Sequence, residues 1–309
     1  MSQIPLFELK NAPGIKIPAI GLGCWSGLTD EEHNAGKAWM LTALQNGYRH
    51  MDTAHGYGTE HSVGNAIRES GIPREEIFVT TKLPSHHHGR VKESLEESLK
   101  RAGFEYYDLY LMHWPQAFVF RNDDPNPLRE DGNYDVVDHP DVNETWADME
   151  KLLETGKVKA IGISNFSVKT LTQLLKTAKV TPAVNQVEIH PHQNQNELKE
   201  LCDSKGIVLT AYSPSGYAPV REDPAVVAIA KKHNVSPAQV SLAWHLSRGI
   251  VAVPKSIKVE HQRANLLELP KLDEEDIATL GTLHKNAHYC GYPGPKDRVL
   301  GWTYEQMGW

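Results

Sequence analysis

The chain has 309 residues, of which 40% are hydrophobic and 23% are charged, and its formal net charge at pH 7 is −7. This composition is typical of a globular protein with a sizeable core, and the negative charge disfavours a general nucleic-acid or anionic-membrane surface. No run of about 18 apolar residues occurs, and the N-terminal stretch lacks the pattern of a secretory signal. Three widely spaced cysteines, Cys24, Cys202 and Cys290, suit free thiols in a reducing compartment. We therefore expect a cytoplasmic, monomeric protein that acts on small molecules.

In chain order, the first predicted element is a β-hairpin, in which Phe7–Lys10 and Ile15–Pro18 are joined across a turn that contains Pro13 and Gly14. Short strand-like runs with helical patterns between them then recur along the chain. The eight runs are Ile17–Gly23, Tyr48–Ala54, Ile77–Leu83, Tyr107–His113, Val158–Ser164, Ala183–Ile189, Ile207–Ser213 and Ile250–Ser256.

The intervening helices are marked by apolar residues at helical spacing and by glycine stops. Val91, Leu95, Leu99 and Ala102 share one face and are followed by Gly103, and a similar pattern that includes Trp146, Met149 and Leu152 precedes Gly156. Two further helical patterns, Pro224–His233 and Pro237–Ser247, stand between the seventh and eighth strands.

Repeated strand–helix units imply parallel strands, and eight of them close most naturally as a (β/α)8, or TIM, barrel, for which roughly 250 residues is typical. We predict an α/β protein with one such barrel domain over residues 1–309, an N-terminal β-hairpin and extra helices. Active sites of this fold lie where the strands end. The long polar segment Gln116–Asp141, after the fourth strand, is either a substrate-side loop or a mobile surface insertion.

The residues at the predicted strand ends are mostly polar or aromatic, whereas core filling would favour Val, Ile or Leu. They are Trp25, Asp52, Lys82, His113, Trp114, Ser164, Asn165, Gln186, Tyr212, Ser213, Lys255 and Ser256. Singly, each is more often a turn, core or surface residue, but together they describe a lined pocket. Tyr57, just after Asp52, could donate a proton there if the Lys82 ammonium stabilised its phenolate and Asp52 kept that ammonium ionised.

Three segments carry a resemblance to a known family: Gly47 to Tyr57 (GYRHMDTAHGY), Leu109 to Pro115 (LYLMHWP) and Val253 to Ser256 (VPKS). With further matches at Gly162 to Phe166 and at Asn185-Gln186, the chain resembles the aldo-keto reductase superfamily, close to its aldose, xylose and glycerol reductase branch. The similarity runs from about Ile17 to at least Asn265.

The resemblance implies a reductase of aldehydes and ketones, such as small aldehydes, aldoses and glyceraldehyde-like compounds, that takes a hydride from a nicotinamide cofactor. Tyr57 would be the general acid, Lys82 and Asp52 its tuning pair, and His113 the residue that orients the carbonyl. Trp25 and Trp114 would form walls of the substrate pocket. The residues implied to bind the cofactor are Ser164, Asn165 and Gln186 at the carboxamide, Tyr212 against the ring, Ser213 beside it, and Lys255, Ser256, His261 and Asn265 toward the adenosine end.

One departure concerns the coenzyme. His261 stands where the family usually has an arginine that pairs with the 2′-phosphate of NADPH, and Arg263 would point away on a helix. Lys255 remains as a cationic partner, so NADPH is favoured and NADH use remains possible. The short segment after the seventh strand, 213–219, predicts fast cofactor exchange, and the tail from His284 to Trp309, with Tyr292 among its aromatic residues, is expected to help define the substrate pocket.

Other interpretations are weaker. The run His86-His87-His88 suggests a metal, but its side chains diverge and no Cys or acid cluster is expected nearby, so we expect none. A non-catalytic subunit that senses nicotinamide redox state on the same barrel is the main alternative function, and retention of all four catalytic residues argues against it. A hydrolase would need paired carboxylates or metal ligands at the strand ends.

Overall fold

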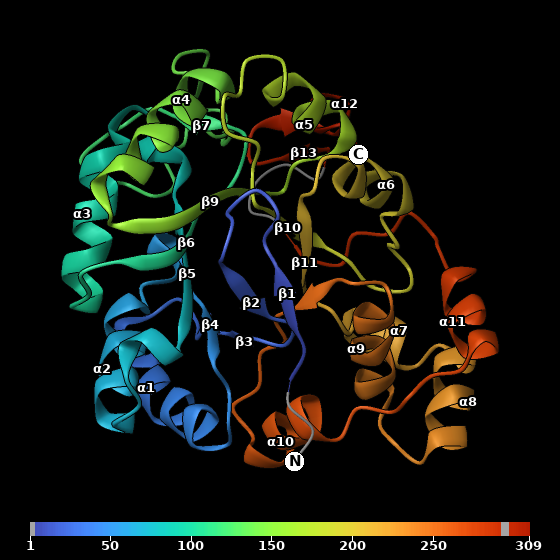
Figure 1. Ribbon diagram of the computed structural model, residues 1–309. Coiled ribbons are helices and arrows are strands. Elements are labelled where there is room, and N and C mark those ends of the chain that lie inside the picture. The colour runs from blue at the N-terminus through green and yellow to red at the C-terminus, as the bar shows by residue number, and fades with distance from the viewer. Residues whose placement is uncertain (1–3, 292–296) are drawn as a thin grey trace.

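Eight parallel strands curve around a common axis and form the centre of the protein (Figure 1). The structure is a computed structural model that describes residues 4–291 and 297–309. In order around the sheet the strands are β3 (Leu22–Gly23), β4 (His50–Asp52), β5 (Phe78–Leu83), β6 (Tyr107–Met112), β9 (Val158–Ser164), β10 (Val184–Glu188), β11 (Val208–Tyr212) and β12 (Val251–Ala252). The predicted (β/α)8 architecture is confirmed.

The barrel closes between its first and last strands. The backbone N–H of Gly21 donates to the Ala252 carbonyl at 2.9 Å, and the Ala252 N–H donates to Ala19 at 2.9 Å. Gly23 is required at this seam, because a Cβ there would lie 2.9 Å from the Val253 carbonyl oxygen. Close backbone approach thus explains a glycine in an otherwise buried strand.

Helices surround the sheet, as expected for this architecture (Figure 1). They are α1 (Asp30–Gln45), α2 (Glu60–Ser70), α3 (Val91–Ala102), α4 (Val142–Leu152), α5 (Val168–Leu174), α6 (Asn196–Ser204), α7 (Tyr217–Arg221), α8 (Pro224–His233), α9 (Pro237–Ser247), α10 (Val259–Leu267), α11 (Glu274–Gly281) and α12 (Tyr304–Met307), with short 3-10 turns η1 (His55–Tyr57), η2 (Arg74–Glu76), η3 (Ser85–Arg90) and η4 (Leu153–Thr155). Gly103 ends α3 in the left-handed conformation at φ 67°, as predicted. The bounds predicted for α8 and α9 are confirmed.

The N-terminal hairpin closes one end of the barrel. Strands β1 (Leu6–Glu8) and β2 (Lys16–Pro18) pair antiparallel, and Leu9 and Ile17 pack against interior residues of the barrel strands. One prediction is corrected here: Ile17–Gly23 is not a single strand. Its first part, Ile17–Pro18, pairs within the hairpin, the stretch from Ala19 to Gly21 bonds to Ala252 across the seam, and the first barrel strand proper is Leu22–Gly23.

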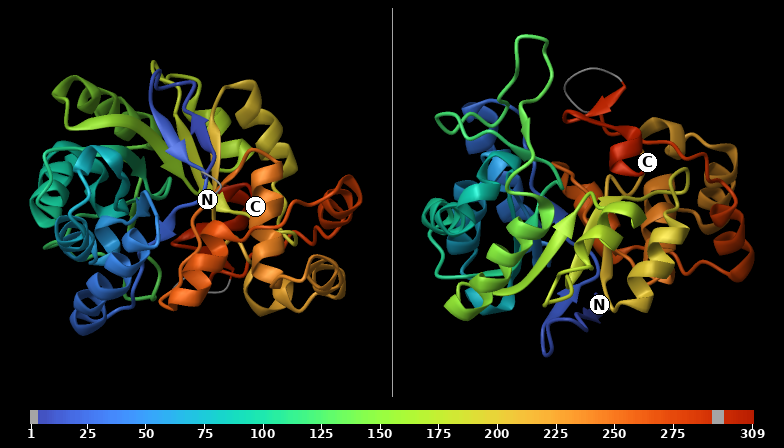
Figure 2. Two further views of the ribbon diagram at one scale, coloured as in Figure 1. Left: turned by 60° about the horizontal axis from the view of Figure 1, so that its bottom comes forward. Right: turned by 90° about the horizontal axis from the view of Figure 1, so that it is seen from above.

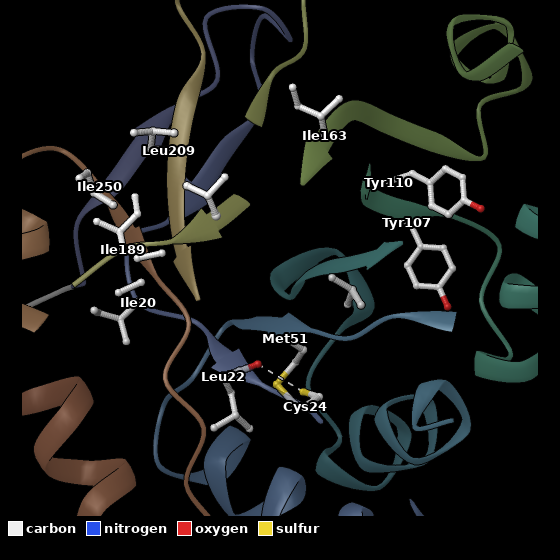
Figure 3. Close-up of a cluster of buried hydrophobic side chains, with 14 of the residues drawn as sticks. Ile20, Leu22, Cys24, Met51, Tyr107, Tyr110, Ile163, Ile189, Leu209 and Ile250 are labelled. Carbon is white, nitrogen blue, oxygen red and sulfur yellow. Dashed lines mark hydrogen bonds between the residues drawn. The ribbon is translucent and has the colours of Figure 1, made fainter. Parts of the chain in front are cut away.

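From Leu109 onward, successive side chains of β6 face two different cores, as the pleat requires. In β6, Leu109 and Leu111 point into the barrel with Val184 and Val251. Tyr110, on the opposite face, belongs to the larger core between the sheet and the helices, together with the residues labelled in Figure 3.

The long segment after β6 and the C-terminal tail lie at the end of the barrel opposite the hairpin (Figure 2). Each contains a short antiparallel pair: β7 (Ala117–Phe118) with β8 (Val136–Val137), and β13 (Arg298–Val299) with β14 (Trp302–Thr303). Phe118, Tyr134, Val299, Leu300 and Met307 form a small apolar cluster that joins the two segments. The loop is therefore packed and is not simply a surface insertion. Tyr292 lies outside the described residues.

No helix in the described ranges combines the length and the apolar character needed to cross a bilayer.

Helix α2 approaches α3 so closely at Gly64 that a Cβ there would overlap the carbonyl oxygen of Ala102. We predict that Gly64→Ala lowers the free energy of unfolding by roughly 1–3 kcal/mol through overpacking, although alanine ordinarily favours a helix. The matched control is Gly281→Ala, because Gly281 is also helical and a Cβ there meets nothing within 4 Å. Urea unfolding of both variants tests this; equal stabilities would contradict the packing argument.

Candidate active site

A cavity of about 910 Å³ opens at the ends of the parallel strands. Every site residue predicted from the sequence lines it, except Lys82, which is buried beneath it. The predicted residues along its wall are Trp25, Asp52, Tyr57, His113, Trp114, Ser164, Asn165, Gln186, Tyr212, Ser213, Lys255, Ser256, His261 and Asn265.

The floor of the cavity is built on a buried ion pair. Lys82 Nζ lies 2.7 Å from Asp52 Oδ1 and donates a second hydrogen bond to the Thr53 carbonyl at 2.9 Å. Its third partner is the Tyr57 hydroxyl at 3.4 Å. Asp52 and Lys82 come from neighbouring strands β4 and β5, and Tyr57 ends the 3-10 turn η1 that follows β4. Parallel strand ends thus bring the three groups together.

Burial and charge act in opposite directions on this cluster. Burial disfavours the ammonium, but the Asp52 carboxylate, together with Tyr57 and the hydrogen bonds to both groups, raises the pKa of Lys82 above its ordinary value. Burial also raises the pKa of Tyr57, and the Lys82 ammonium opposes this only in part. From the sequence we expected Lys82 to make Tyr57 a stronger acid, but the net shift of the Tyr57 pKa is upward. Desolvation is the larger effect, so Tyr57 is protonated through the neutral range.

His113 faces the Tyr57 ring from the end of β6, with ring centroids 5.6 Å apart and an interplanar angle of 74°. Burial, followed by the nearby Lys82 charge, lowers the pKa of His113 well below its usual range. Its imidazole is consequently neutral at pH 7 and can offer one N–H to an acceptor in the cavity.

A second group of polar residues spans β9, β10 and β11. Ser164 Oγ donates to the Gln186 carbonyl at 2.8 Å, and the Tyr212 hydroxyl donates to Asn165 Oδ1 at 2.8 Å. Gln186 Nε2 donates to Asp52 Oδ2 at 2.6 Å, so this group is joined to the ion pair. Asn165 and Ser213 adopt positive φ angles of 65° and 47°, a strained conformation that often marks functional sites.

The far end of the cavity carries positive charge. Lys255 is exposed, and its Nζ lies about equally far from two indole rings, 6.0 Å from Trp25 and 5.9 Å from Trp39. His261, in α10, lines the cavity, whereas Arg263 does not, in agreement with the helical argument from sequence. Trp25 thus lies beside Lys255, while Trp114 contacts His113 and the C-terminal Trp309.

Residues 19–285 match the family model described as "Aldo/keto reductase family". The chain belongs to that family. It is 47% identical over 283 residues to the glycerol 2-dehydrogenase (NADP(+)) of Saccharomyces cerevisiae, which covers 88% of this chain and 89% of that protein. It is 43% identical to the aldehyde reductase YPR1 of the same yeast, with 90% of each chain covered. The solved aldose reductase of Schistosoma japonicum superposes with a TM-score of 0.84 at 34% identity and 94% coverage of both chains.

Sequence reading missed part of the wall of this aldo/keto reductase. Tyr217 and Arg221, on the short helix α7, also line the cavity, and so does Cys290, in the tail that was expected to help define the pocket. Gly216, at φ 60°, turns the chain back into α7 directly after β11, so residues beyond Ser213 fold over the opening. The signal in the sequence that could have indicated this turn is Gly216 itself, a glycine shortly after the end of a strand.

The premise that no acid lies near the histidine run is wrong. Asp123, in the long loop, is 2.6 Å from His87 Nε2, and potential ligand atoms of His55, His87, Glu97 and Asp123 lie within 4.8 Å of one another. Arg101 hydrogen-bonds to His55, and Arg90 contacts both Glu97 at 2.7 Å and His87 at 3.2 Å. In this structure the two guanidinium groups balance the carboxylates, and the network holds the long loop against the barrel.

The buried ion pair generates a stability prediction. In Asp52→Asn the Lys82 ammonium keeps its burial but loses its counter-charge, which we expect to cost about 3–5 kcal/mol of unfolding free energy. The Lys151–Asp148 pair is the matched control, because its N–O distance is also 2.7 Å but both side chains are exposed. Asp148→Asn should unfold at the same urea concentration as the parent, since exposed pairs contribute little. Similar losses in both variants would contradict the assignment of the effect to burial.

Proposed function

We propose that this aldo/keto reductase reduces aldehydes and ketones to alcohols with NADPH, and that Tyr57 delivers the proton to the carbonyl oxygen. The observation that carries the proposal is the Asp52–Lys82–Tyr57 cluster on the cavity floor beside a neutral His113. A tyrosine hydroxyl that is protonated at pH 7 and faces a cavity is a group suited to general acid catalysis.

Each neighbour of Tyr57 has a distinct task in this proposal. The Lys82 ammonium stabilises the phenolate that forms as the proton leaves, and Asp52 keeps that ammonium charged inside the protein. The neutral His113 donates a hydrogen bond that orients the carbonyl oxygen toward the Tyr57 hydroxyl. Trp25 and Trp114 supply apolar walls that exclude water from the substrate.

The cavity fits an extended dinucleotide, because polar groups stand at both of its ends. Ser164, Asn165 and Gln186 would hold the carboxamide, with Ser213 nearby, and the Tyr212 ring would face the nicotinamide. When bound, the cofactor supplies a hydride to the carbonyl carbon. Because its Nε2 is engaged by Asp52, Gln186 would use its amide oxygen for the carboxamide.

At the adenosine end, Lys255, Ser256, His261 and Asn265 would bind the ribose and its 2′-phosphate. The exposed ammonium of Lys255 supports NADPH, and so does the coenzyme in the name of the yeast glycerol dehydrogenase. NADH use is compatible with His261, because an imidazole lacks the permanent charge and the two-pronged grip with which an arginine holds a phosphate. The alternative, a non-catalytic subunit that senses nicotinamide redox state, shares the cofactor site but needs no proton donor.

We predict that Tyr57→Phe, which keeps the ring and removes the acid, lowers the rate of glyceraldehyde reduction by at least about 10²–10⁴-fold. The dissociation constant for NADPH should change little. The reduction is followed as loss of NADPH absorbance, and cofactor binding as quenching of tryptophan fluorescence. Near-parent turnover in the variant would refute the assignment, and no turnover by the parent across an aldehyde panel would favour the sensor alternative.

Tyr57 also determines how the rate of reduction should depend on pH. Reduction needs protonated Tyr57, and burial raises the pKa of Tyr57 above its ordinary value. The rate of the chemical step should therefore be flat through the neutral range and decline only at alkaline pH. A decline that begins below pH 8 would point to a different proton donor.

The coenzyme prediction concerns His261 and Lys255. Arginine is always charged and can grip a phosphate with two hydrogen bonds, so His261→Arg should lower the Michaelis constant for NADPH and leave that for NADH nearly unchanged. Lys255→Ala should impair NADPH use far more than NADH use. Ratios of kcat/KM for the two coenzymes test this, and a ratio that ignores both substitutions would place the adenosine end elsewhere.

A further inference from the structure

We propose that Glu188 is a positioning residue that holds the C-terminal segment 288–290 over the substrate end of the cavity. This inference rests on the proposed function only where it concerns the carbonyl substrate. Glu188 is the last residue of β10 and is buried, so a charge at this place needs strong partners.

Those partners come from the tail. Glu188 Oε1 accepts the backbone N–H of Tyr289 at 2.7 Å and that of Cys290 at 3.2 Å. Oε2 lies 3.3 Å from His288 Nδ1. Hydrogen bonds to a buried carboxylate are charge-assisted and stronger than neutral ones, so a single side chain of the barrel fixes the backbone of Tyr289 and Cys290, with the His288 imidazole at ion-pair distance.

The carboxylate is charged at every working pH. Burial alone would raise the pKa of Glu188, but hydrogen bonds from His190, His288 and the Tyr289 N–H lower it to about 2. His190 also stacks on the Tyr289 ring, with centroids 5.1 Å apart at 15°. Glu188 and His190 thus both contact the tail from the barrel side, and we call these contacts with residues 288–290 the clamp.

What the clamp positions is part of the cavity wall. Cys290 lines the cavity, and its Sγ lies 3.0 Å from Ser213 Oγ and 3.4 Å from the Tyr217 hydroxyl. On the other side, the His288 ring stacks on Trp309 at 4.2 Å, and Trp309 contacts Trp114 at 6.1 Å. Loosening the segment would therefore displace both Cys290 and the support of Trp114, without touching Tyr57 or Lys82.

The test replaces Glu188 by glutamine, which keeps the shape and removes the charge. Cys24 and Cys202 are fully buried, so Cys290 is the thiol among the three that can report on the tail. Because a hydrogen bond to a charged group contributes about 1.5–3 kcal/mol, we expect iodoacetamide to label Cys290 at least roughly 10-fold faster in Glu188→Gln. Peptide mass spectrometry identifies the labelled cysteine.

The kinetic expectation is a rise in KM for aldehydes with kcat and the KM for NADPH retained. Glu222→Gln is the matched control, because Glu222 is an exposed glutamate next to α7, and it should change neither labelling nor kinetics. If Glu188→Gln does not fold, His288→Ala, which removes the Oε2 partner and the Trp309 stack, must show the same faster labelling.

The outcomes separate the two proposals. Faster labelling in a protein that reduces no carbonyl compound would keep the clamp and overturn the proposed function. Unchanged labelling and unchanged aldehyde KM in the folded Glu188→Gln protein would overturn the clamp and leave the proposed function intact.

Discussion

The rest of the site depends on one buried ion pair. Lys82 has no exposed surface, and an ammonium moved there alone would lose several kcal/mol of hydration and shed its proton. Asp52 at 2.7 Å prevents that, and Gln186 and Thr53 satisfy further hydrogen-bonding capacity of the pair. The resulting fixed charge lies within hydrogen-bonding distance of the Tyr57 hydroxyl, and it adds to the effect of burial in lowering the pKa of His113, so one ion pair acts on both neighbouring groups.

The strand-end part of this arrangement could be predicted from sequence, because it follows from a repeat. A residue at the end of one parallel strand lies beside the residues at the ends of the next, so Asp52, Lys82 and His113 had to meet once the strands were placed. Helix stops at Gly103 and Gly156 were readable for a similarly local reason, since a left-handed C-cap demands glycine.

What sequence could not supply was the long-range pairing of irregular segments. Asp123 meets His87 and Glu188 meets Tyr289 across 36 and 101 residues, and no periodicity links those positions. The split of Ile17–Gly23 was missed for another reason: the run is apolar throughout, and pattern alone does not reveal where the chain leaves one sheet for another. The net direction of the Tyr57 shift was also beyond reach, because it is a balance of burial against charge that needs coordinates.

Different parts of the fold support the floor of the cavity and its opposite wall, and this difference affects how the substrate preference of the protein could change. The Asp52–Lys82–Tyr57 cluster rests on β4 and β5, whose strands are paired with their neighbours and packed on both faces. The opposite wall is formed by α7 and the tail, and the long loop packs against the tail; loop and tail are joined to the barrel through a few side-chain contacts such as those of Asp123 and Glu188. A substitution in the second group can reshape the wall at little cost to the first, because the strands do not depend on those contacts for their pairing. Variation in substrate and constancy of chemistry are thus compatible within one barrel, and the few charged contacts that join tail and loop to the barrel are the places where such variation is constrained.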